Sequence, residues 1–466
     1  MTAGAAPRVV ILGGGLAGLC AAWECHRQGL GAVVLEAQPR AGGVIRTDVV
    51  DGVVLDTGPD AFLVSKPGAI TLCRELGLEG QLISMSPPRG AYVLRDGVLH
   101  ALPEGGAFGI ATRVGPFLRS TLLSPAGKLR VALEPLVPAR RGGEDESAGA
   151  FFRRRFGHEA AERIAQPLLG GIHAGDLDRL SVEAVLPQLA TVERGGGSVL
   201  LALRRQGQRA TEGGAFRSFP GGMATLVDTL VAALPPDTLR LGTAATAIEP
   251  VGTGWRVRTG KGDAVEADIL VLAAPAPTVA EWLAPVAPEA SAQAAGIRYV
   301  SSAGVLAVYP RASVATPLRG SGYVSTPGTG REPLLATSWL SNKWAGRAPD
   351  DRVVLRGFFG GAYDEAVLRH DDETLVNTAH ESWVRRFGIQ APPSLARVVR
   401  WTRSSPQHEV GHGARVAQIE AALAALPPVA VCGSGFRAVG IPDVASDART
   451  TMRSLLDGWR QAAGSR

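Results

Sequence analysis

The segment VVILGGGLAGLCAAWECHRQGLGAVVLE (residues 9–36) constrains the fold more strongly than any other stretch of this chain. An apolar run at residues 9–12 predicts a buried parallel strand, and the three glycines that follow it predict a tight turn. The apolar segment that begins at Leu16 predicts a helix to about Gln28, and a second apolar run ends at Glu36. Strand, turn, helix and strand in this order are typical of the first βαβ unit of a doubly wound α/β domain.

These glycines and the acidic residue predict a dinucleotide site. Gly13 permits the turn, Gly15 lets a pyrophosphate approach the backbone, and Gly18 allows the helix to pack closely on the strand. The N-terminus of the helix offers free N–H groups to a diphosphate. Glu36 follows the glycines by about twenty residues, where a carboxylate accepts hydrogen bonds from ribose hydroxyls. Because 59 of the 466 residues are glycine, the prediction depends on the complete unit and not on glycine spacing alone.

Composition limits the class of protein. A chain of 466 residues with 45% hydrophobic residues and a net charge of +5 is expected to form two or three lobes. Aromatic residues make up only 5% and no nucleic-acid motif is found, so we expect no nucleic-acid partner and interpret the basic run at 153–155 as a solvated helix face. No apolar run reaches the roughly 18 residues of a spanning helix, so a membrane contact would be peripheral, on the inner face of the cell membrane. The spacing of the four cysteines is not of the metal-binding type, so we predict a reduced, cytoplasmic protein without a metal site. They are Cys20, Cys25, Cys73 and Cys432.

Later motifs favour FAD as the dinucleotide. An Arg-x-Gly-Gly sequence at 40–43 follows the acidic residue, and a Gly-Pro pair at 58–59 follows the next predicted strand. Flavoproteins that bind FAD through this type of fold often carry such a continuation, whereas nicotinamide enzymes generally do not. The segments at 218–234, 240–283 and 427–466 again predict strands, glycine turns and helices that belong with the first unit.

Two insertions separate these segments. Residues from about 100 to 200 are predicted to be mostly helical, with an exposed loop at 140–149, and residues 284–424 alternate strands and helices. We therefore predict an α/β fold: a discontinuous, Rossmann-like FAD-binding domain, an α+β substrate domain and a helical insertion. The expected boundaries are 1–86, 208–283 and 425–466 for the FAD-binding domain, 87–207 for the first substrate-domain strands and the helical insertion, and 284–424 for the remaining substrate domain.

Nine motifs, in order and over nearly the whole chain, carry a family resemblance. They are GGGLAGLCAAW, PRAGGVIRT, GPDAFL, LRDGVLHALP, PLLGGIHAGDLDRLS, FPGGMATL, AAPAPTVA, SPQHEVGH and AVGIPD. The set resembles the porphyrinogen oxidases of haem biosynthesis, which are FAD enzymes of the wider amine oxidase and phytoene desaturase superfamily. The resemblance implies three successive two-electron oxidations of a porphyrinogen, with hydride transfer to the flavin N5 and oxygen as the final acceptor. It also allows a transient contact with a ferrochelatase.

The resemblance leaves the substrate open between coproporphyrinogen III and protoporphyrinogen IX. Protoporphyrinogen oxidases tend to place a propionate-binding arginine at the position of Ala91, and here Arg89 lies two positions earlier. Four segments are more similar to the coproporphyrinogen enzymes: GKLRVALEPLVP, FFRRRFG, SWLSNKW and AVGIPD. We expect coproporphyrinogen III, with protoporphyrinogen IX as the alternative. More distant alternatives are an amine oxidase, a carotenoid desaturase, or an inactive flavin-binding relative.

The resemblance also assigns site residues, although it implies no catalytic side chain. Expected FAD contacts are Gly13, Gly14, Gly15, Leu16, Ala17, Gly18, Glu36, Ala37, Arg40, Gly42, Gly43, Gly58, Pro59, Ala245, Gly433, Val439, Gly440, Ile441 and Pro442. Expected substrate contacts are Lys66, Arg89, Gly171, Trp339 and Lys343. The lysines are candidate propionate partners or else surface charges. Gly171 has a carbonyl that faces the macrocycle or else ends a helix, and Trp339 lines the pocket or else packs in the core.

Four residues depart from the family pattern. Ala438 and Asp447 replace glycines of the C-terminal motif, Ala245 replaces a valine beside adenine, and His408 replaces a tyrosine. An aspartate near the flavin pyrophosphate would repel its negative charge unless the side chain points away. FAD affinity is therefore the property that these changes bring into question. His412 is expected to be a hydrogen-bonded structural histidine.

Overall fold

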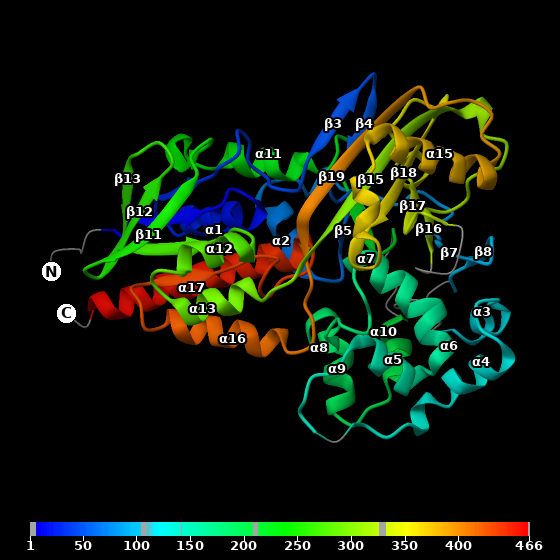
Figure 1. The fold of residues 1–466 in the computed structure, drawn as a ribbon, viewed down its shortest axis with the longest axis horizontal. Coiled ribbons are helices and arrows are strands. Elements are labelled where there is room, and N and C mark those ends of the chain that lie inside the picture. The colour runs from blue at the N-terminus through cyan, green and yellow to red at the C-terminus, as the bar shows by residue number, and fades with distance from the viewer. Residues whose placement is uncertain are drawn as a thin grey trace.

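The computed structural model describes residues 6–103, 110, 113–140, 142–207, 213–325 and 332–464. Figure 1 shows a first lobe in which α1 (Leu16–Arg27) and α17 (Ile441–Gly464) lie side by side, although they come from opposite ends of the chain. A second lobe is built on a long mixed sheet, and a helical part lies beneath that sheet in the same view.

A five-stranded parallel sheet forms the centre of the first lobe, in the order β10-β2-β1-β14-β20. Its strands are β1 (Val9–Leu12), β2 (Ala32–Leu35), β10 (Leu239–Arg240), β14 (Ile269–Leu272) and β20 (Val429–Val431). Val9 and Ile11 pack on one face of the sheet, and Val10 and Leu12 pack on the other. Because both faces are covered, every residue of the strand is apolar, which confirms the predicted buried parallel strand.

Helices cover both faces of this sheet. One face carries α1, α2 (Pro67–Glu75), α11 (Ala224–Ala233) and α17. The other carries α12 (Ala276–Leu283), α13 (Pro288–Ala295), α16 (His412–Leu423) and an antiparallel sheet of β11 (Ala245–Val251), β12 (Gly254–Thr259) and β13 (Ala264–Ala267). We expected α13 and α16 in the substrate domain, but Ala290 and Ile419 are buried in the core of the first lobe. The lobe thus extends past the boundaries at 283 and 424.

The second lobe is a seven-stranded sheet in the order β19-β15-β18-β17-β16-β7-β8. Its strands are β7 (Tyr92–Arg95), β8 (Val98–Ala101), β15 (Tyr299–Pro310), β16 (Gly322–Ser325), β17 (Ala336–Trp339), β18 (Arg352–Gly360) and β19 (Leu395–Pro406). One face packs on α15 (Asp372–Phe387), with Trp383 at the centre of the contact. The other face meets the first lobe, where Leu55 packs with Val354 and Trp344.

Short elements join the two lobes. They are the hairpin β3 (Thr47–Val50) and β4 (Val53–Asp56), the small sheet of β5 (Phe62–Leu63), β9 (Phe216–Ser218) and β6 (Ile83–Ser84), and the one-turn helix α14 (Leu340–Lys343). The hairpin belongs to the first lobe by sequence but contributes Val53 and Leu55 to the core beneath the second sheet. This core therefore holds the two lobes together.

The helical part confirms the prediction of a mostly helical insertion. It contains α3 (Val114–Arg119), α4 (Pro125–Ala132), α5 (Ala148–Phe156), α6 (His158–Ala160), a π-helix (Ala161–Gly170), α7 (Gly171–His173), α8 (Val182–Val185), α9 (Pro187–Arg194) and α10 (Val199–Gly207). Of the predicted loop at 140–149, residues 142–144 are exposed, residue 141 lies outside the described residues, and α5 already begins at Ala148.

One expectation for this part is wrong. The basic run at 153–155 is not a solvated face throughout, because the Arg155 side chain is 1% exposed and pairs with the buried Glu134 at 2.6 Å. Successive residues of a helix point about 100° apart, so the third arginine of the run faces the core while the first two reach the surface.

Candidate functional site

The glycine turn after β1 has the shape that a dinucleotide phosphate requires. Gly13 has φ +109°, and a Cβ there would lie 2.7 Å from the Ala273 carbonyl oxygen. A Cβ on Gly18 would lie 1.8 Å from the Gly13 oxygen, so that position is needed for packing. Gly15 faces open space, where the nearest atom to an added Cβ is the Gly43 Cα at 3.9 Å. Because Gly15 occupies the N-cap position before α1 and provides no side-chain cap, the free N–H groups of the first turn fit an anion.

Glu36 is held in place beside this turn. Its carboxylate accepts hydrogen bonds from the Gly14 N–H at 2.6 Å and from the Gln38 N–H at 2.7 Å, one on each oxygen. A carboxylate has about four acceptor positions, so both oxygens keep capacity for hydroxyl donors. The geometry is that of a preformed diol acceptor at the end of β2.

The segment before β11 lies next to Glu36. The Thr243 N–H donates to the Glu36 carbonyl oxygen at 2.8 Å, and Ala37 is exposed beside it. Ala245 follows two residues later, and its carbonyl accepts from the Trp282 indole N–H at 3.1 Å. The structure thus brings three of the expected cofactor residues to one edge of the first sheet.

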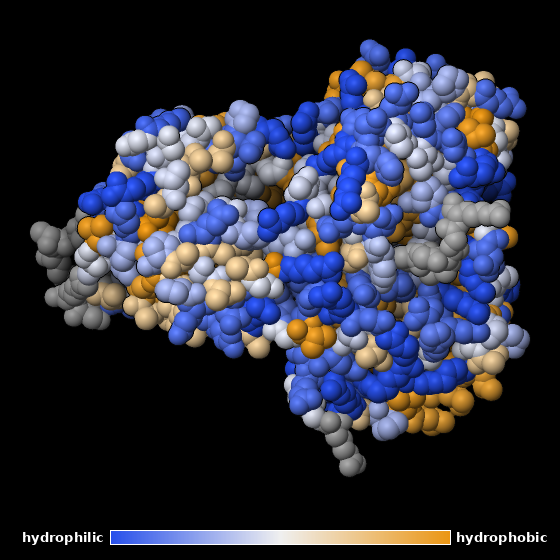
Figure 2. Space-filling view, in the orientation of Figure 1, coloured by the Kyte–Doolittle hydropathy of each residue, from blue (hydrophilic) through white to orange (hydrophobic). Residues whose placement is uncertain are grey.

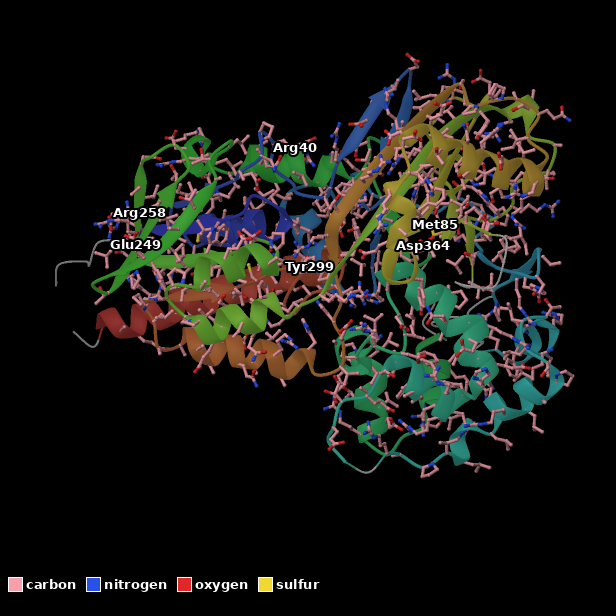
Figure 3. All side chains as sticks on the ribbon, viewed as in Figure 1. Arg40, Met85, Glu249, Arg258, Tyr299 and Asp364 are labelled. Atoms are coloured by element: carbon pink, nitrogen blue, oxygen red, sulfur yellow. The ribbon has the colours of Figure 1, made fainter. Side chains whose placement is uncertain are left out.

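Arg40, which is labelled in Figure 3, holds the Arg-x-Gly-Gly loop in shape. Its guanidinium donates to the carbonyl oxygens of Gly43 at 2.6 Å and Ile45 at 3.3 Å. The Gly42 N–H in turn donates to the Gly14 carbonyl at 2.8 Å, which joins this loop to the glycine turn. Arg40 therefore shapes the loop through hydrogen bonds to its backbone.

Asp447 is electrically compensated. Its carboxylate accepts the Gly433 N–H at 2.8 Å and the Arg437 guanidinium at 2.7 Å, and the side chain is 11% exposed. The sequence suggested that Asp447 would repel the flavin pyrophosphate, but its carboxylate is paired and is not a free negative charge. Ala438 is 1% exposed within the core of the first lobe, so its methyl group is accommodated there. Val439 and Gly440 form the turn into the 24-residue helix α17, which begins with Ile441 and Pro442.

Two stacked histidines support the loop that contains Gly433. The rings of His408 and His412 are 4.0 Å apart, and they contact the carbonyl oxygens of Ser434 at 2.9 Å and Phe436 at 2.6 Å. Burial lowers the pKa of His408 to about 3, with a smaller contribution from His412, so the pair is neutral at physiological pH. The prediction that His412 is a hydrogen-bonded structural histidine is confirmed.

Gly58 and Pro59 lie in a segment, residues 56–60, that we call the seam because the second lobe grips it. Arg356 of β18 donates to the carbonyl oxygens of Gly58 at 2.5 Å and Thr57 at 3.0 Å. Trp401 of β19 donates its indole N–H to the same Thr57 oxygen at 3.2 Å. The expected flavin-contacting backbone is therefore positioned by side chains of the other lobe.

Both ends of the seam carry carboxylates that are paired with cations. Asp56 pairs with Arg347 at 2.5 Å, and both side chains are at most 1% exposed. Asp60 accepts hydrogen bonds from Lys343 at 2.7 Å and from the Trp344 indole at 2.8 Å. Burial alone would raise the pKa of Asp60, but the charge and hydrogen bond of Lys343 hold it well below its usual range.

The expected propionate partners are placed as follows. Lys343 is 14% exposed and is engaged by Asp60, and Lys66 pairs with Asp443 at 2.5 Å with 38% of its side chain exposed. Both lysines therefore have protein partners in this structure. Arg89 is exposed and donates to the Met85 carbonyl at 2.9 Å, which leaves its remaining N–H groups toward solvent.

The structure decides between the two interpretations given above for Gly171 and for Trp339. Gly171 has φ −65° within continuous helical backbone, and the left-handed residue that ends α7 is Ala174. The alternative of a helix-ending glycine at 171 is therefore wrong. Trp339 is 2% exposed and packs edge-on against Phe387 of α15, 5.8 Å between ring centres. Because its side chain faces α15, the pocket-lining role expected for Trp339 is corrected to core packing.

A flat row of residues crosses the face of the second sheet that is turned toward the seam. The pairing register places Gly304, Phe358, Ala336 and Val324 side by side on four neighbouring strands. Phe358 keeps part of its ring exposed, and a Cβ on Gly171 would lie 3.5 Å from Val324. Arg356 shares this surface, because its Nε would lie 3.5 Å from a Cβ on Gly304 and its guanidinium carbon lies 4.6 Å from the centre of the Phe358 ring.

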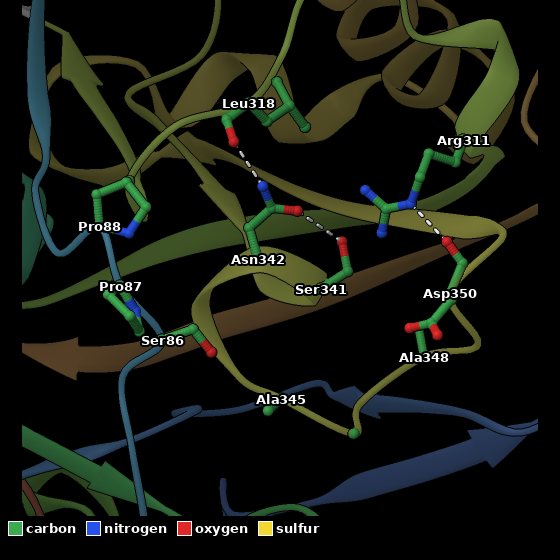
Figure 4. A pocket seen from close by; sticks show the side chains of 12 residues that line it. Ser86, Pro87, Pro88, Arg311, Leu318, Ser341, Asn342, Ala345, Ala348 and Asp350 are labelled. Carbon is green, nitrogen blue, oxygen red and sulfur yellow. Dashed lines mark hydrogen bonds between the residues drawn. The ribbon is translucent and has the colours of Figure 1, made fainter.

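A separate cavity of about 380 Å³ lies beside α14, on the side away from the contact between Lys343 and Asp60 (Figure 4). Ser341 and Asn342 face it from α14, and Arg311 and Asp350 lie at its rim. The same helical turn presents Lys343 to Asp60, away from this cavity. None of the predicted site residues lines it.

Sequence reasoning missed the residues that grip the seam, above all Arg356. One signal was present: an arginine within the apolar strand VVLRGFFGG (353–361) shares its face with Val354 and Phe358 and so must be buried. Nothing in the sequence indicates that its partners are backbone carbonyls 298 and 299 residues away.

This chain is similar to known proteins over nearly its whole length. The chain is 33% identical to the coproporphyrinogen III oxidase of Bacillus subtilis (strain 168), over 96% of this chain and 97% of the other. It is 32% identical to the coproporphyrinogen III oxidase of Propionibacterium freudenreichii subsp. freudenreichii, over 96% and 90%. A solved structure from Exiguobacterium sp. 255-15, named as a candidate protoporphyrinogen oxidase, is 30% identical with a TM-score of 0.85 and covers 97% of this chain and 99% of its own. The sequence pattern of the family described as flavin containing amine oxidoreductase matches residues 16–450, and the chain therefore belongs to that family.

Proposed function

We propose that this chain oxidises coproporphyrinogen III to coproporphyrin III in haem biosynthesis, with FAD as the hydride acceptor. The observation that carries the proposal is the similarity over 96% of the chain to coproporphyrinogen III oxidases. The absence of an arginine at Ala91 favours this substrate over protoporphyrinogen IX, which is the alternative.

FAD fits the first lobe because each part of it has a matching group. The diphosphate would meet the open N-terminus of α1 at Gly15, and the ribose would meet the Glu36 carboxylate. The turn into α17 and the seam at Gly58 would hold the flavin end. FAD, when bound, supplies the hydride acceptor, and the chain itself needs no nucleophile or acid–base pair.

The second lobe would hold the macrocycle. Phe358 and the small residues beside it offer a flat apolar surface, and Gly171 approaches this surface from the helical part. Coproporphyrinogen III carries four propionates, and burial of an unpaired carboxylate costs several kcal/mol. We propose that those propionates meet Arg89, Lys66 and solvent at the edge of this surface.

The decisive test is a matched oxidation assay of both porphyrinogens, followed by porphyrin fluorescence. We expect the higher kcat/KM with coproporphyrinogen III, and a steep loss of rate with added salt because the propionates are drawn by exposed cations. Tenfold more efficient oxidation of protoporphyrinogen IX under the same conditions would establish the alternative. Absence of bound flavin after reconstitution would instead favour an inactive relative.

Peripheral contact with an acidic membrane surface is a further part of the proposal. None of the helices in the described ranges is long and apolar enough to cross a membrane. Figure 2 shows an apolar patch on the helical part, where Leu118, Leu129, Leu133 and Leu136 are 43% to 77% exposed. Lys128 lies next to Leu118, which adds positive charge at this patch. Sedimentation with vesicles that contain acidic lipid tests this contact, and equal binding to neutral vesicles would contradict the charge argument. Oxygen as acceptor and contact with a ferrochelatase also remain proposals.

A further inference from the structure

Arg356 is buried without a carboxylate of its own. Its guanidinium is 5% exposed and donates only to the backbone oxygens of Thr57 and Gly58, and no described residue accepts from its Nε. The guanidinium carbon lies 4.6 Å from the centre of the Phe358 ring. Burial of a charged group is costly unless an anion compensates it, so this arrangement calls for an explanation.

The charges around the seam do not cancel. Arg347 is matched by Asp56, and Lys343 is matched by Asp60. Arg356 is the third cation at the same segment, while the segment itself offers two carboxylates. Among the described groups that contact the seam, one positive charge is therefore left over. It lies between the backbone of Gly58 and the ring of Phe358.

A flavin ring that accepts a hydride provides the missing anion. The hydride brings two electrons and one proton to the neutral oxidised ring, which then carries one negative charge. A positive charge in a site of low dielectric constant stabilises such an anion far more than water would. A substrate propionate could also compensate the charge, but residues 56–58 of the seam are buried and Arg356 is anchored to the segment that the family resemblance assigns to FAD.

We propose that Arg356 is a positioning residue for the flavin: it fixes the Thr57–Gly58 backbone and supplies the buried positive charge that favours the reduced ring. The inference rests on the proposed flavin-dependent function. It adds that a side chain of the second lobe favours reduction of the flavin. The midpoint potential of the flavin therefore depends on correct docking of the two lobes.

The test is the two-electron midpoint potential of bound FAD, measured with a reference dye in the absence of porphyrinogen. Arg356→Gln keeps N–H donors and removes the charge, so the reduced flavin should be disfavoured at least tenfold, a fall of about 30 mV. Arg356→Lys keeps the charge and should stay within threefold of the unmodified chain. Trp401→Phe is the matched control, because it removes a neutral donor to the same Thr57 oxygen and should leave the potential unchanged.

Three results would overturn the inference: an unchanged potential in an FAD-bound Arg356→Gln variant, an equal shift in Trp401→Phe, or a tenfold shift in Arg356→Lys. If the Gln variant does not retain FAD, Arg356→Met removes the charge in a side chain of similar length, and its potential is measured and judged in the same way. A raised KM for porphyrinogen with an unchanged potential would assign the charge to a substrate carboxylate instead. Failure of the unmodified chain to bind FAD or to oxidise a porphyrinogen would refute the proposed function, which is a separate result.

Discussion

Removal of the Glu36 carboxylate is expected to weaken FAD binding without unfolding the protein. Glu36 is half-buried at the end of β2, and its two oxygens are oriented by the N–H groups of Gly14 and Gln38. Each hydrogen bond to a charged acceptor contributes about 1.5 to 3 kcal/mol. Loss of one net ribose hydrogen bond in Glu36→Ala therefore predicts an increase in Kd of about tenfold to a hundredfold.

The assay is a fluorescence titration of the apoprotein with FAD, accompanied by thermal unfolding of the apoprotein. Glu36→Gln keeps an oxygen for the Gly14 N–H without the charge and should give an intermediate Kd. Glu79→Ala is the control, because Glu79 forms only a surface pair with Arg74 in the same lobe. A Kd for Glu36→Ala within threefold of the unmodified chain, at equal apoprotein stability, would show that Glu36 is not the ribose ligand.

Three further outcomes are expected. The flavin is noncovalent, because no motif for a covalent link is found, so acid precipitation should release all the yellow colour into the supernatant; colour in the pellet would contradict this. His408 has a folded pKa of about 3 against about 6.5 when unfolded, so its stabilising effect is complete above pH 6.5 and is lost as the pH falls toward 3. His408→Tyr should therefore flatten the pH dependence of the free energy of unfolding by up to about 1.4 kcal/mol per pH unit in that range, as measured by urea unfolding. Glu134→Gln should destabilise the helical part by about 3 to 5 kcal/mol, because it leaves the buried Arg155 with only the longer 3.7 Å contact to Glu193, and a change below 1 kcal/mol in chemical denaturation would refute this.

Local order was predictable and long-range order was not. The βαβ unit could be read from residues 9–36 because its strand, turn and helix depend on neighbours in sequence. The packing of α13 on the first lobe depends on which sheet lies near it in space, and its eight-residue sequence carries no such information. The side of the sheet on which Trp339 lies could not be predicted either. Alternation predicts that one face of a strand is buried, but here both faces are covered.

The candidate site follows the same division. Backbone geometry at Gly13 and Gly18 could be anticipated, because a tight turn and close packing have one common residue solution. Charge pairing could not, since the partners of Lys343, Arg347 and Asp447 are set by tertiary contacts. The question that Asp447 raised in the sequence is answered only by the position of Arg437.

The interleaved order of the first sheet has a consequence for how the chain folds. β1 pairs with β14, and Glu24 of α1 is bonded to Arg449 of α17, 425 residues later. Contacts of such long sequence separation form slowly, because a large loop must be closed before they contribute to stability. During synthesis the helical part can collect its own core while the opening strand is paired with β2 alone and still lacks β14 on its other side. The βαβ unit that dominates the sequence is thus expected to be among the last parts of the molecule to become stable.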